Sequence, residues 1–572
     1  MSEYKKIVVS KNRHFWVIIK RKVGSALLCV FFGLNTAWAM VDGAKKKQVE
    51  VSVQNQGSLG YGSLASVRNF YEGVFGYLSS LDVLSFMLGR RHAPRIQEAA
   101  FDFCAKKPLS FAGRDIPDEL FSSIEKSYCR KIEILDLSYS RFNFAALSKL
   151  PKTLVELSLD SVEGLTHDAE FSAGLLDAVL RFPHLKKLHL SNNQVNDAAV
   201  ARIAEVLQLT ELGLSGNAIS DIGVSSISQM KDLQVLDLSC NQVTDQGAHS
   251  LSQMEGLSQL SLSHNEIGDV GAGYVARMQG IVHLNLSYNQ IGSFGAFSLS
   301  QMQGLVSLEL GYNQIGDVGV SSISSMQSLT HLNLAYNQIG VLGALSLSQM
   351  QGIAHLDLSY NQIDDSALTH LSQMQEIIDL NLSCNQISDD GVFALSQMHR
   401  VARLNLSCNQ ISDGSFFSLS QMQELVSLDL SCNHVGDHGL AYILQMPSIH
   451  ELDLENNQVG DVGAFRLSQV PGLTHLNLAG NEIGDVGAGY LSQMQQIVHL
   501  NLAYNQIGDL GASSLSGIQG VKYLSLLGNQ VGKDGICFLS QMQGIFNFSE
   551  TKQITHLNFY KNKIKENCGL YY

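Results

Sequence analysis

The sequence predicts an α/β solenoid of about eighteen coils, a horseshoe with parallel strands on its concave face and short helices on its convex face. Two observations support this fold class. Fifteen asparagines recur every 24 residues from Asn193 to Asn529, each in a block with leucines at fixed positions. Degenerate copies flank the regular blocks, at residues 135–159 and 556–559. A constant period of about 20 to 29 residues is typical of stacked coils and not of a compact enzyme domain.

Each regular block reads L-x-x-L-x-L-S-x-N-Q-I-G-D-x-G-A-x-x-L-S-Q-M. This block resembles the leucine-rich repeat, and the resemblance implies a protein that recognises a partner along an extended surface. The leucines eight, five and three residues before the asparagine, with the Ile or Val two residues after it, are expected to point inward. L-x-L is then a short parallel strand whose outward positions line the concave face.

The repeated asparagine is expected to be buried at a turn, where it satisfies backbone groups of neighbouring coils. The aspartate four residues later is expected to cap the short helix that follows, in which glycine and alanine allow close packing against the strands. Twelve of the fifteen methionines stand thirteen residues after the asparagine. This column is predicted to fill the core, although a methionine-rich face can also be a promiscuous binding surface.

Four of the nine cysteines stand directly before a repeated asparagine, namely Cys240, Cys384, Cys408 and Cys432. Parallel strands place neighbouring residues about 4.8 Å apart, but in-register side chains point the same way and not at each other. These cysteines are therefore predicted to be free thiols. An oxidised pair among Cys384, Cys408 and Cys432 is the alternative.

The chain divides into four predicted segments. Residues 1–39 have the pattern of a signal peptide, with basic residues before the apolar run 26–34 and Ala37-Trp38-Ala39 as the cleavage site. A retained membrane anchor is the alternative, and no other segment reaches transmembrane length. Residues 40–66 are a predicted linker and residues 67–130 a helical region. Residues 131–572 form the repeat domain, with regular repeats at about 185–540 and a C-terminal cap at 541–572.

The charge of the chain argues against two classes of partner. The net charge is −14, and residues 1–39 carry seven Lys or Arg and one Glu, so the expected mature chain has a net charge of −20. A surface this acidic repels nucleic acid and anionic lipid. The sequence therefore predicts a protein exported through a signal peptide, with no stable membrane span after cleavage.

The segment from Phe70 to Met87 reads as two apolar helices separated by Ser79-Ser80-Leu81-Asp82. This segment resembles an F-box, and the resemblance implies binding to a Skp-type adaptor. The alternative is an ordinary helical cap for the first coil of the solenoid. The adaptor-binding positions that the F-box pattern implies are Val74, Phe75, Tyr77, Leu78, Leu81, Asp82, Val83, Leu84 and Phe86.

An F-box followed by leucine-rich repeats with Gly-Ala-x-x-Leu is similar to the GALA-type bacterial effectors. That resemblance implies a secreted effector, delivered to host cytosol, that recruits a cullin ubiquitin ligase while its repeats bind a target protein. The alternative is an exported or surface adhesion or scaffold protein, similar to internalins, without a role in ubiquitination.

The outward positions of the strands line the concave face and give the candidate partner site, which is expected to include a strip of tyrosines on neighbouring strands. A histidine-rich column lies six residues before the asparagine, a polar column lies four before it, and four tyrosines lie directly before it. Aromatic groups beside polar ones are typical of the centre of a protein interface. Simple copying of these residues during duplication is the alternative. The candidate residues are Tyr288, Tyr312, Tyr336, Tyr360, His331, His355 and Asp357.

Nothing in the sequence predicts an enzyme, a cofactor or a metal site. There is no Gly-x-Ser-x-Gly elbow, phosphate-binding loop or Cys-x-x-Cys pair, and no large region outside the repeats in which a catalytic domain could fold. Parallel strand spacing gives His331, His355 and Asp357 no closed tetrahedral cage.

Overall fold

The computed structural model describes residues 109–116, 132–142, 144–162, 179, 181–540 and 556–558. They divide into two compact units, the first with the described residues among 1–194 and 208–212, and the second with those among 195–207 and 213–572. The described residues of the first unit form four parallel strands paired in sequence order and one short 3-10 helix. These elements are β1 (Leu109–Ser110), β2 (Ile134–Asp136), η3 (Phe144–Lys149), β3 (Glu156–Ser158) and β4 (Lys187–His189).

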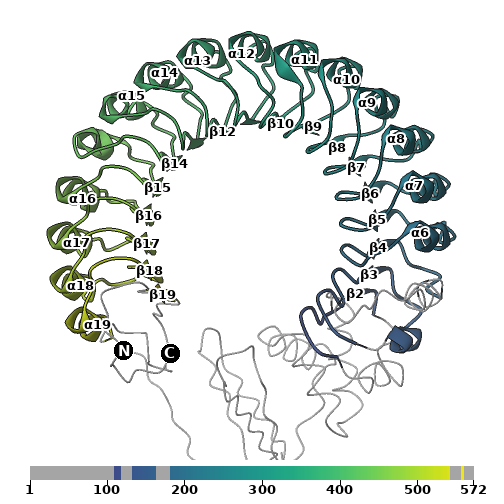
Figure 1. Ribbon diagram of the computed structural model, residues 1–572, viewed down its shortest axis with the longest axis horizontal. Coiled ribbons are helices and arrows are strands. Elements are labelled where there is room, and N and C mark those ends of the chain that lie inside the picture. The colour runs from purple at the N-terminus through teal and green to yellow at the C-terminus, as the bar shows by residue number, and fades with distance from the viewer. Residues whose placement is uncertain are drawn as a thin grey trace, which may run out of the picture. The chain divides into compact units, whose positions relative to one another are not determined.

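The second unit is a stack of coils in which strands follow the inner side of a curve and helices follow the outer side (Figure 1). Each strand pairs in parallel with the strand of the next coil, and from β6 to β18 the register places each residue opposite the one 24 positions later. β5 (Glu211–Gly213) contains residues of both units. The remaining strands are β6 (Val235–Asp237), β7 (Gln259–Ser261), β8 (His283–Asn285), β9 (Ser307–Glu309), β10 (His331–Asn333), β11 (His355–Asp357), β12 (Asp379–Asn381), β13 (Arg403–Asn405), β14 (Ser427–Asp429), β15 (Glu451–Asp453), β16 (His475–Asn477), β17 (His499–Asn501), β18 (Tyr523–Ser525) and β19 (His556–Asn558).

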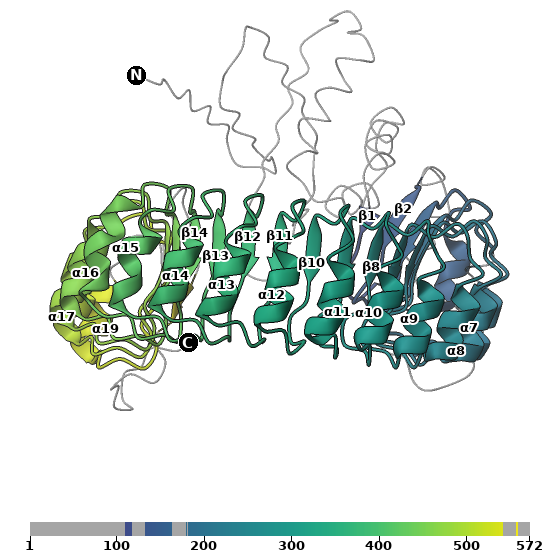
Figure 2. The same ribbon diagram turned by 90° about the horizontal axis from the view of Figure 1, so that it is seen from above.

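Almost every coil of the second unit has one helix of about two turns, and α9 to α14 lie side by side across the outer face (Figure 2). The predicted fold class, an α/β solenoid with strands on the concave face and short helices on the convex face, is confirmed for the described residues. The helices are α6 (Asp197–Ile203), α7 (Asp221–Ile227), α8 (Asp245–Leu251), α9 (Asp269–Val275), α10 (Ser293–Leu299), α11 (Gly316–Ile323), α12 (Val341–Leu347), α13 (Asp365–Leu371), α14 (Asp389–Leu395), η4 (Asp413–Ser415), α15 (Phe416–Leu419), η5 (Gly439–Gln445), α16 (Asp461–Ser468), α17 (Asp485–Leu491), α18 (Asp509–Leu515) and α19 (Lys533–Leu539).

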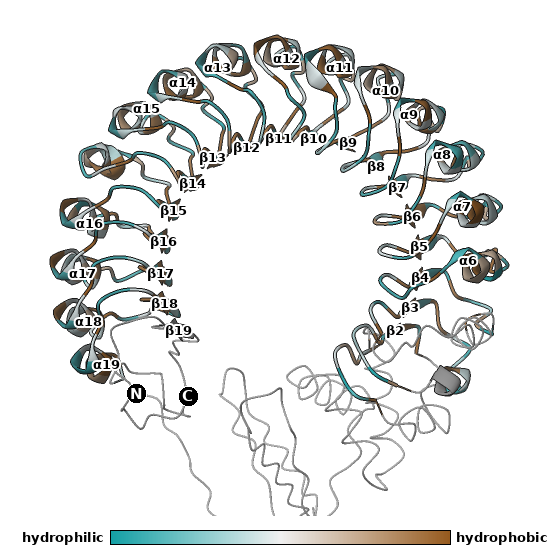
Figure 3. Ribbon diagram, in the orientation of Figure 1, coloured by the Kyte–Doolittle hydropathy of each residue, from teal (hydrophilic) through white to brown (hydrophobic). Residues whose placement is uncertain are grey.

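The core lies between the strands and the helices, and hydrophobic and hydrophilic residues alternate along each coil (Figure 3). In the coil of Asn289, the side chains of Ile281, Leu284, Leu286 and Ile291 are at most 1% exposed. Full burial of each such side chain contributes about 1.5 to 3 kcal/mol. The methionine column is also buried from Met230 to Met494, which confirms its predicted core role, whereas Met542 lies outside the described residues.

The repeated asparagine links successive coils, as predicted. Asn313 is 6% exposed, and its Nδ2 donates to the Leu286 carbonyl of the preceding coil at 2.9 Å. Its Oδ1 accepts from the backbone N–H of Ile291, also in the preceding coil, at 2.9 Å. The same pair of bonds recurs along the stack, so each asparagine satisfies a buried donor and a buried acceptor that the neighbouring coil cannot pair by itself.

The repeated aspartate does not cap its own helix, so that prediction was wrong. Asp269 is the first residue of α9, and the capping position belongs to Gly268. The Oδ1 atom of Asp269 accepts instead from the N–H groups of Gly292 and Gly295, at 2.7 and 2.8 Å, at the start of the next helix. The reason is geometric: a residue already inside the first turn has its carboxylate beside the exposed N–H groups of the neighbouring coil.

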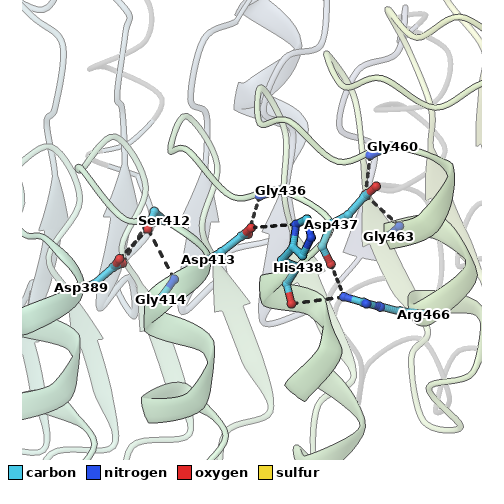
Figure 4. A network of polar contacts seen from close by, with 10 residues as sticks. All are labelled: Asp389, Ser412, Asp413, Gly414, Gly436, Asp437, His438, Gly460, Gly463 and Arg466. Carbon is cyan, nitrogen blue, oxygen red and sulfur yellow. Dashed lines mark hydrogen bonds and ion pairs between the residues drawn. The ribbon is translucent and has the colours of Figure 1, made fainter.

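The bonds between neighbouring coils continue through the coils that have 3-10 helices (Figure 4). Ser412 donates its hydroxyl to Asp389, and Asp413 accepts from the Gly436 N–H at 2.7 Å. In this part of the chain Ser415-Phe416 replaces the usual Gly-Ala pair, and a Cβ on Gly439 would meet the Phe416 ring at 2.7 Å. The larger Phe416 side chain thus accompanies the change from α-helix to 3-10 helix in η4 and η5.

The third helical position is glycine because the aspartate of the preceding coil occupies the space. A Cβ on Gly343 would lie 2.6 Å from Asp317 Oδ1 and 2.5 Å from Ile339 Cγ2. The next coil lacks both residues: Val341 replaces the aspartate, and the glycine is replaced by Ala367, whose N–H is capped by Asp364 at 2.9 Å. Aspartate and glycine therefore occur together in most pairs of neighbouring coils, whereas Gly319 follows Ser293 and Ser415 follows Asp389.

Replacing Asn337 with alanine is expected to lower the free energy of unfolding by about 2 to 4 kcal/mol, because two buried backbone groups lose their partners. Those groups are the Leu310 carbonyl and the Ile315 N–H. Chemical denaturation followed by circular dichroism measures the change. Gln362→Ala, at an exposed position beside the asparagine of the next coil, is the matched control and should leave the midpoint almost unchanged.

Gly343→Ala is expected to destabilise the protein by about 1 to 3 kcal/mol through overpacking against Asp317. Adding Asp317→Val and Gly340→Asp reproduces the natural combination of Val341, Asp364 and Ala367, and it should recover most of the loss. Thermal unfolding of the single and triple variants tests this pairing. Equal destabilisation in both would contradict it.

Candidate functional site

The concave face of β9 to β14 forms an open hollow of about 490 Å³. Two columns of side chains line it, one at the first residue and one at the third residue of each strand. The first column has His331, His355, Asp379, Arg403 and Ser427, and the third has Glu309, Asn333, Asp357, Asn381, Asn405 and Asp429. The candidate residues His331, His355 and Asp357 are thus brought together in one hollow.

The first column carries a chain of stacked and ion-paired groups. The imidazole of His331 stacks on that of His355, with ring centroids 4.1 Å apart and planes 12° apart. His355 Nδ1 forms an ion pair with Asp379, which also contacts the guanidinium of Arg403. Sequence reasoning missed Asp379 and Arg403, although opposite charges 24 residues apart in the same column were a visible signal.

The third column has a structural role that sequence reasoning also missed. The Oδ1 atom of Asp357 accepts from the Ser359 N–H at 2.8 Å, and Asn381 and Asn405 make the same bond to the second residue after them. This side-chain turn ends each strand. The second polar atom of the side chain, Oδ2 in aspartate or Nδ2 in asparagine, remains for contacts with neighbouring coils. One such contact is the 3.1 Å bond from Asn381 Nδ2 to Asp357 Oδ2.

Two groups of the hollow have shifted pKa values. Burial raises the pKa of the Glu309 carboxyl, and the nearby Asp357 charge raises it further, against the effect of a hydrogen bond with Asn333. Burial lowers the pKa of the His331 imidazole, and so do His355 and His283, against the effect of Asp379. Both shifts favour the uncharged form, the neutral imidazole of His331 and the protonated carboxyl of Glu309, relative to the ordinary pKa values of these groups.

The four candidate tyrosines lie in the turns after the strands and not on the strands themselves. β8 ends at Asn285, and Tyr288 follows with a φ of 56°. The rings of Tyr288 and Tyr312 stack at 4.0 Å and those of Tyr312 and Tyr336 at 4.8 Å, while Tyr336 and Tyr360 are tilted at 6.0 Å. Because the rings cover each other's faces, this aromatic ladder presents ring edges and hydroxyl groups to a partner.

The aromatic ladder continues in both directions along the same turn position. His264 stacks on Tyr288 at 3.8 Å, and Cys384, Cys408 and Cys432 follow Tyr360 in the next three coils. The structure holds Cys240, Cys384, Cys408, Cys432 and Cys537 as free thiols, as predicted for the four cysteines of the repeats.

A second polar group lies on β15 to β18. The His475 and His499 rings stack at 4.5 Å, and Tyr523 lies 5.9 Å from His499. Burial and the charge on His475 lower the pKa of His499. On β15, Asp453 accepts from Asn477 Nδ2 at 2.9 Å, and burial raises the pKa of its carboxyl.

The predicted signal cleavage residues Ala37 and Ala39 lie outside the described part of the chain. So do the F-box-like residues Val74, Phe75, Tyr77, Leu78, Leu81, Asp82, Val83, Leu84 and Phe86, which remain a prediction. Within the described residues, none of the helices has the length and apolar character needed to span a bilayer.

Two family models, both described as leucine rich repeat, match the chain. One matches residues 208–267, 256–315, 303–363 and 471–531. The other matches residues 183–204, 377–396, 421–444 and 445–468. Together they match more than half of the chain. A search of curated proteins found no match.

Solved structures with similar folds come from bacteria and plants. A leucine-rich repeat protein of Leptospira interrogans is 21% identical over 71% of this chain and 99% of that one, with a TM-score of 0.48. An internalin of Listeria monocytogenes is 18% identical over 71% and 93%, with a TM-score of 0.38. The Arabidopsis receptor kinase HAESA, in complex with the peptide hormone IDA and the co-receptor SERK1, is 19% identical over 80% and 77%, with a TM-score of 0.39.

The His331 imidazole is expected to titrate below the ordinary histidine value of about 6.5, because burial and two neighbouring histidines disfavour its charged form. Its folded pKa lies below its unfolded pKa, so its contribution to stability is present above about pH 6.5 and is lost as the pH falls from that value through the lower folded pKa. NMR titration of the histidine ring protons, assigned with His331→Gln, measures the midpoint. A midpoint at or above 6.5 would contradict the burial argument.

Proposed function

We propose that this chain, which belongs to the leucine-rich repeat proteins, binds a protein partner on the concave hollow of β9 to β14. Leucine-rich repeat folds are typical of protein-binding proteins, and the concave hollow supplies the local reason. The observation that carries the proposal is the chain of His331, His355, Asp379 and Arg403, which places two imidazoles, a carboxylate and a guanidinium along one line of exposed and partly exposed side chains.

This line of side chains suits a partner that makes several polar contacts, because the chemical type of the side chain changes from one coil to the next. The stacked imidazoles offer apolar faces and ring nitrogens, while Arg403 offers a planar donor that is 60% exposed. Arginine and aromatic rings are enriched at the energetic centre of protein interfaces. The aromatic ladder Tyr288 to Tyr360, in the turns beside the strands, would extend the interface.

The test selects ligands from a displayed library of peptides and small domains against the purified protein. Ligands should bind a concave triple variant, His355→Ser, Asp357→Asn and Arg403→Ser, at least tenfold more weakly than the unchanged protein. Each substitute already occurs at that position in another coil, as Ser307, Asn333 and Ser427, so the fold should persist. Phe294→Ser with Val318→Ser, at convex positions 77% and 73% exposed, is the matched control. Ligands weakened only by the control pair would overturn the proposal.

The second candidate function concerns the F-box-like segment. The sequence pattern from Val74 to Phe86 favours recruitment of a Skp-type adaptor of a host cullin ubiquitin ligase by a secreted bacterial effector. The competing assignment is an exported, internalin-like adhesion or scaffold protein. In this adaptor role the F-box-like segment would bind the adaptor, and the concave face would bind the protein that is ubiquitinated.

Binding to purified Skp adaptor separates these two assignments. The unchanged protein should bind, Leu78→Ala with Asp82→Ala should weaken binding at least tenfold, and the concave triple variant should bind as the unchanged protein does. The adaptor role would be contradicted if the protein does not bind the adaptor, or if the Leu78→Ala and Asp82→Ala double substitution leaves binding unchanged. Either result leaves the concave-face proposal intact, because the two surfaces are probed by different variants.

A further inference from the structure

Three thiols lie in register in consecutive coils. Cys384, Cys408 and Cys432 have φ angles of 55°, 55° and 54°, so the backbone directs their side chains in the same way. The N–H of Cys384 donates to the Ser407 carbonyl and that of Cys408 to the Ser431 carbonyl, both at 2.8 Å, which holds neighbouring turns at strand-like spacing.

The three thiols form a row along the stack, with Cys408 between Cys384 and Cys432. At one end of the row Asn456 Nδ2 donates to Cys432 Sγ at 3.6 Å, and Tyr360 occupies the same turn position one coil before Cys384. Cys408 and Cys432 are exposed and Cys384 is partly exposed, so the row is open to solvent.

We propose that Cys384, Cys408 and Cys432 bind a soft metal ion that prefers linear coordination by two thiolates, with Cu(I) as the biological member of this class. Soft thiolate ligands select such ions. One ion lies between two adjacent coils, bonded to the sulfur atoms of Cys408 and one of its two neighbours.

The spacing of the coils favours a metal ion over a disulfide. A disulfide requires the two Cβ atoms to approach to about 3.8 Å, whereas equivalent atoms of in-register parallel strands stay about 4.8 Å apart. With the zinc–thiolate bond of about 2.3 Å as an upper guide, two metal–thiolate bonds in line span at most about 4.6 Å, close to this spacing. Side chains that point the same way can therefore share a linear ion without movement of the backbone.

The same geometry excludes a tetrahedral ion from this row. The thiols lie one per coil along a line, and within the described residues no three His, Cys, Asp or Glu side chains are grouped to hold a metal ion. A tetrahedral zinc site needs four ligands around one point.

Binding releases two protons and involves no change of oxidation state. Two S–H bonds are broken, two sulfur–metal bonds form, and the protons pass to solvent. A thiol with an ordinary pKa of about 8.5 is mostly protonated at neutral pH, and a coordinated cation stabilises the thiolate by its charge.

The test titrates Cu(I) into the reduced protein under anaerobic conditions against a coloured Cu(I) chelator. The unchanged protein should withdraw one Cu(I) per chain. Cys408→Ser removes both adjacent pairs and should abolish this binding, whereas Cys384→Ser or Cys432→Ser leaves one adjacent pair and should retain it. Circular dichroism checks that each variant is folded.

The matched control is Cys240→Ser. Cys240 occupies the same turn position with a φ of 53°, but the residues one coil away on each side are Gly216 and His264. This variant should bind one Cu(I), as the unchanged protein does. Binding that persists in Cys408→Ser, or that is lost in Cys240→Ser, would overturn the proposal. So would a thiol count that falls by two on mild oxidation of the unchanged protein but not of Cys408→Ser, since the row would then favour a disulfide.

Discussion

The hydrogen bonds between each coil and its neighbours are the interaction on which the rest of the structure depends. A coil of 24 residues cannot satisfy its own turn, because the N–H and carbonyl groups there point along the stack. Asn313 satisfies two such groups of the preceding coil, and Asp269 satisfies two of the following one. The chain therefore repeats because each coil satisfies backbone groups of its neighbours, and this requirement keeps asparagine at a constant position and aspartate and glycine at theirs in most coils.

The same requirement determines where function can lie. Positions that close a turn or fill the core are not free to vary, and even the outward Asp357 and Asn381 use one atom to end their strands. The side chain of the first residue of each strand is not needed to end the strand. It changes through histidine, aspartate, arginine and serine along β10 to β14, and there the imidazole, carboxylate and guanidinium groups of the concave hollow meet. Local variation on a constant scaffold is the physical basis for partner recognition.

Most of the fold could be predicted from the sequence because its causes are local and repeated. The buried leucines, the methionine column and the role of Asn313 follow from the period alone. The role of Asp269 could not be predicted in the same way, since a capping residue and a first-turn residue differ by one position and their partners lie in different coils. The turn position of Tyr288 was missed for a related reason: the strand ends three residues before it, at Asn285.

The sequence by itself determined the period, the parallel strands, the core columns and the set of side chains on each column, because a 24-residue repeat leaves one way to stack these residues. Only the tertiary structure decided which neighbours pair across coils. It joined His355 and Arg403 through Asp379, stacked the rings of Tyr288 and Tyr312 face to face, and placed Cys384, Cys408 and Cys432 in register at one turn position. Rotamers and distances between coils depend on packing on both sides, which a linear pattern does not contain.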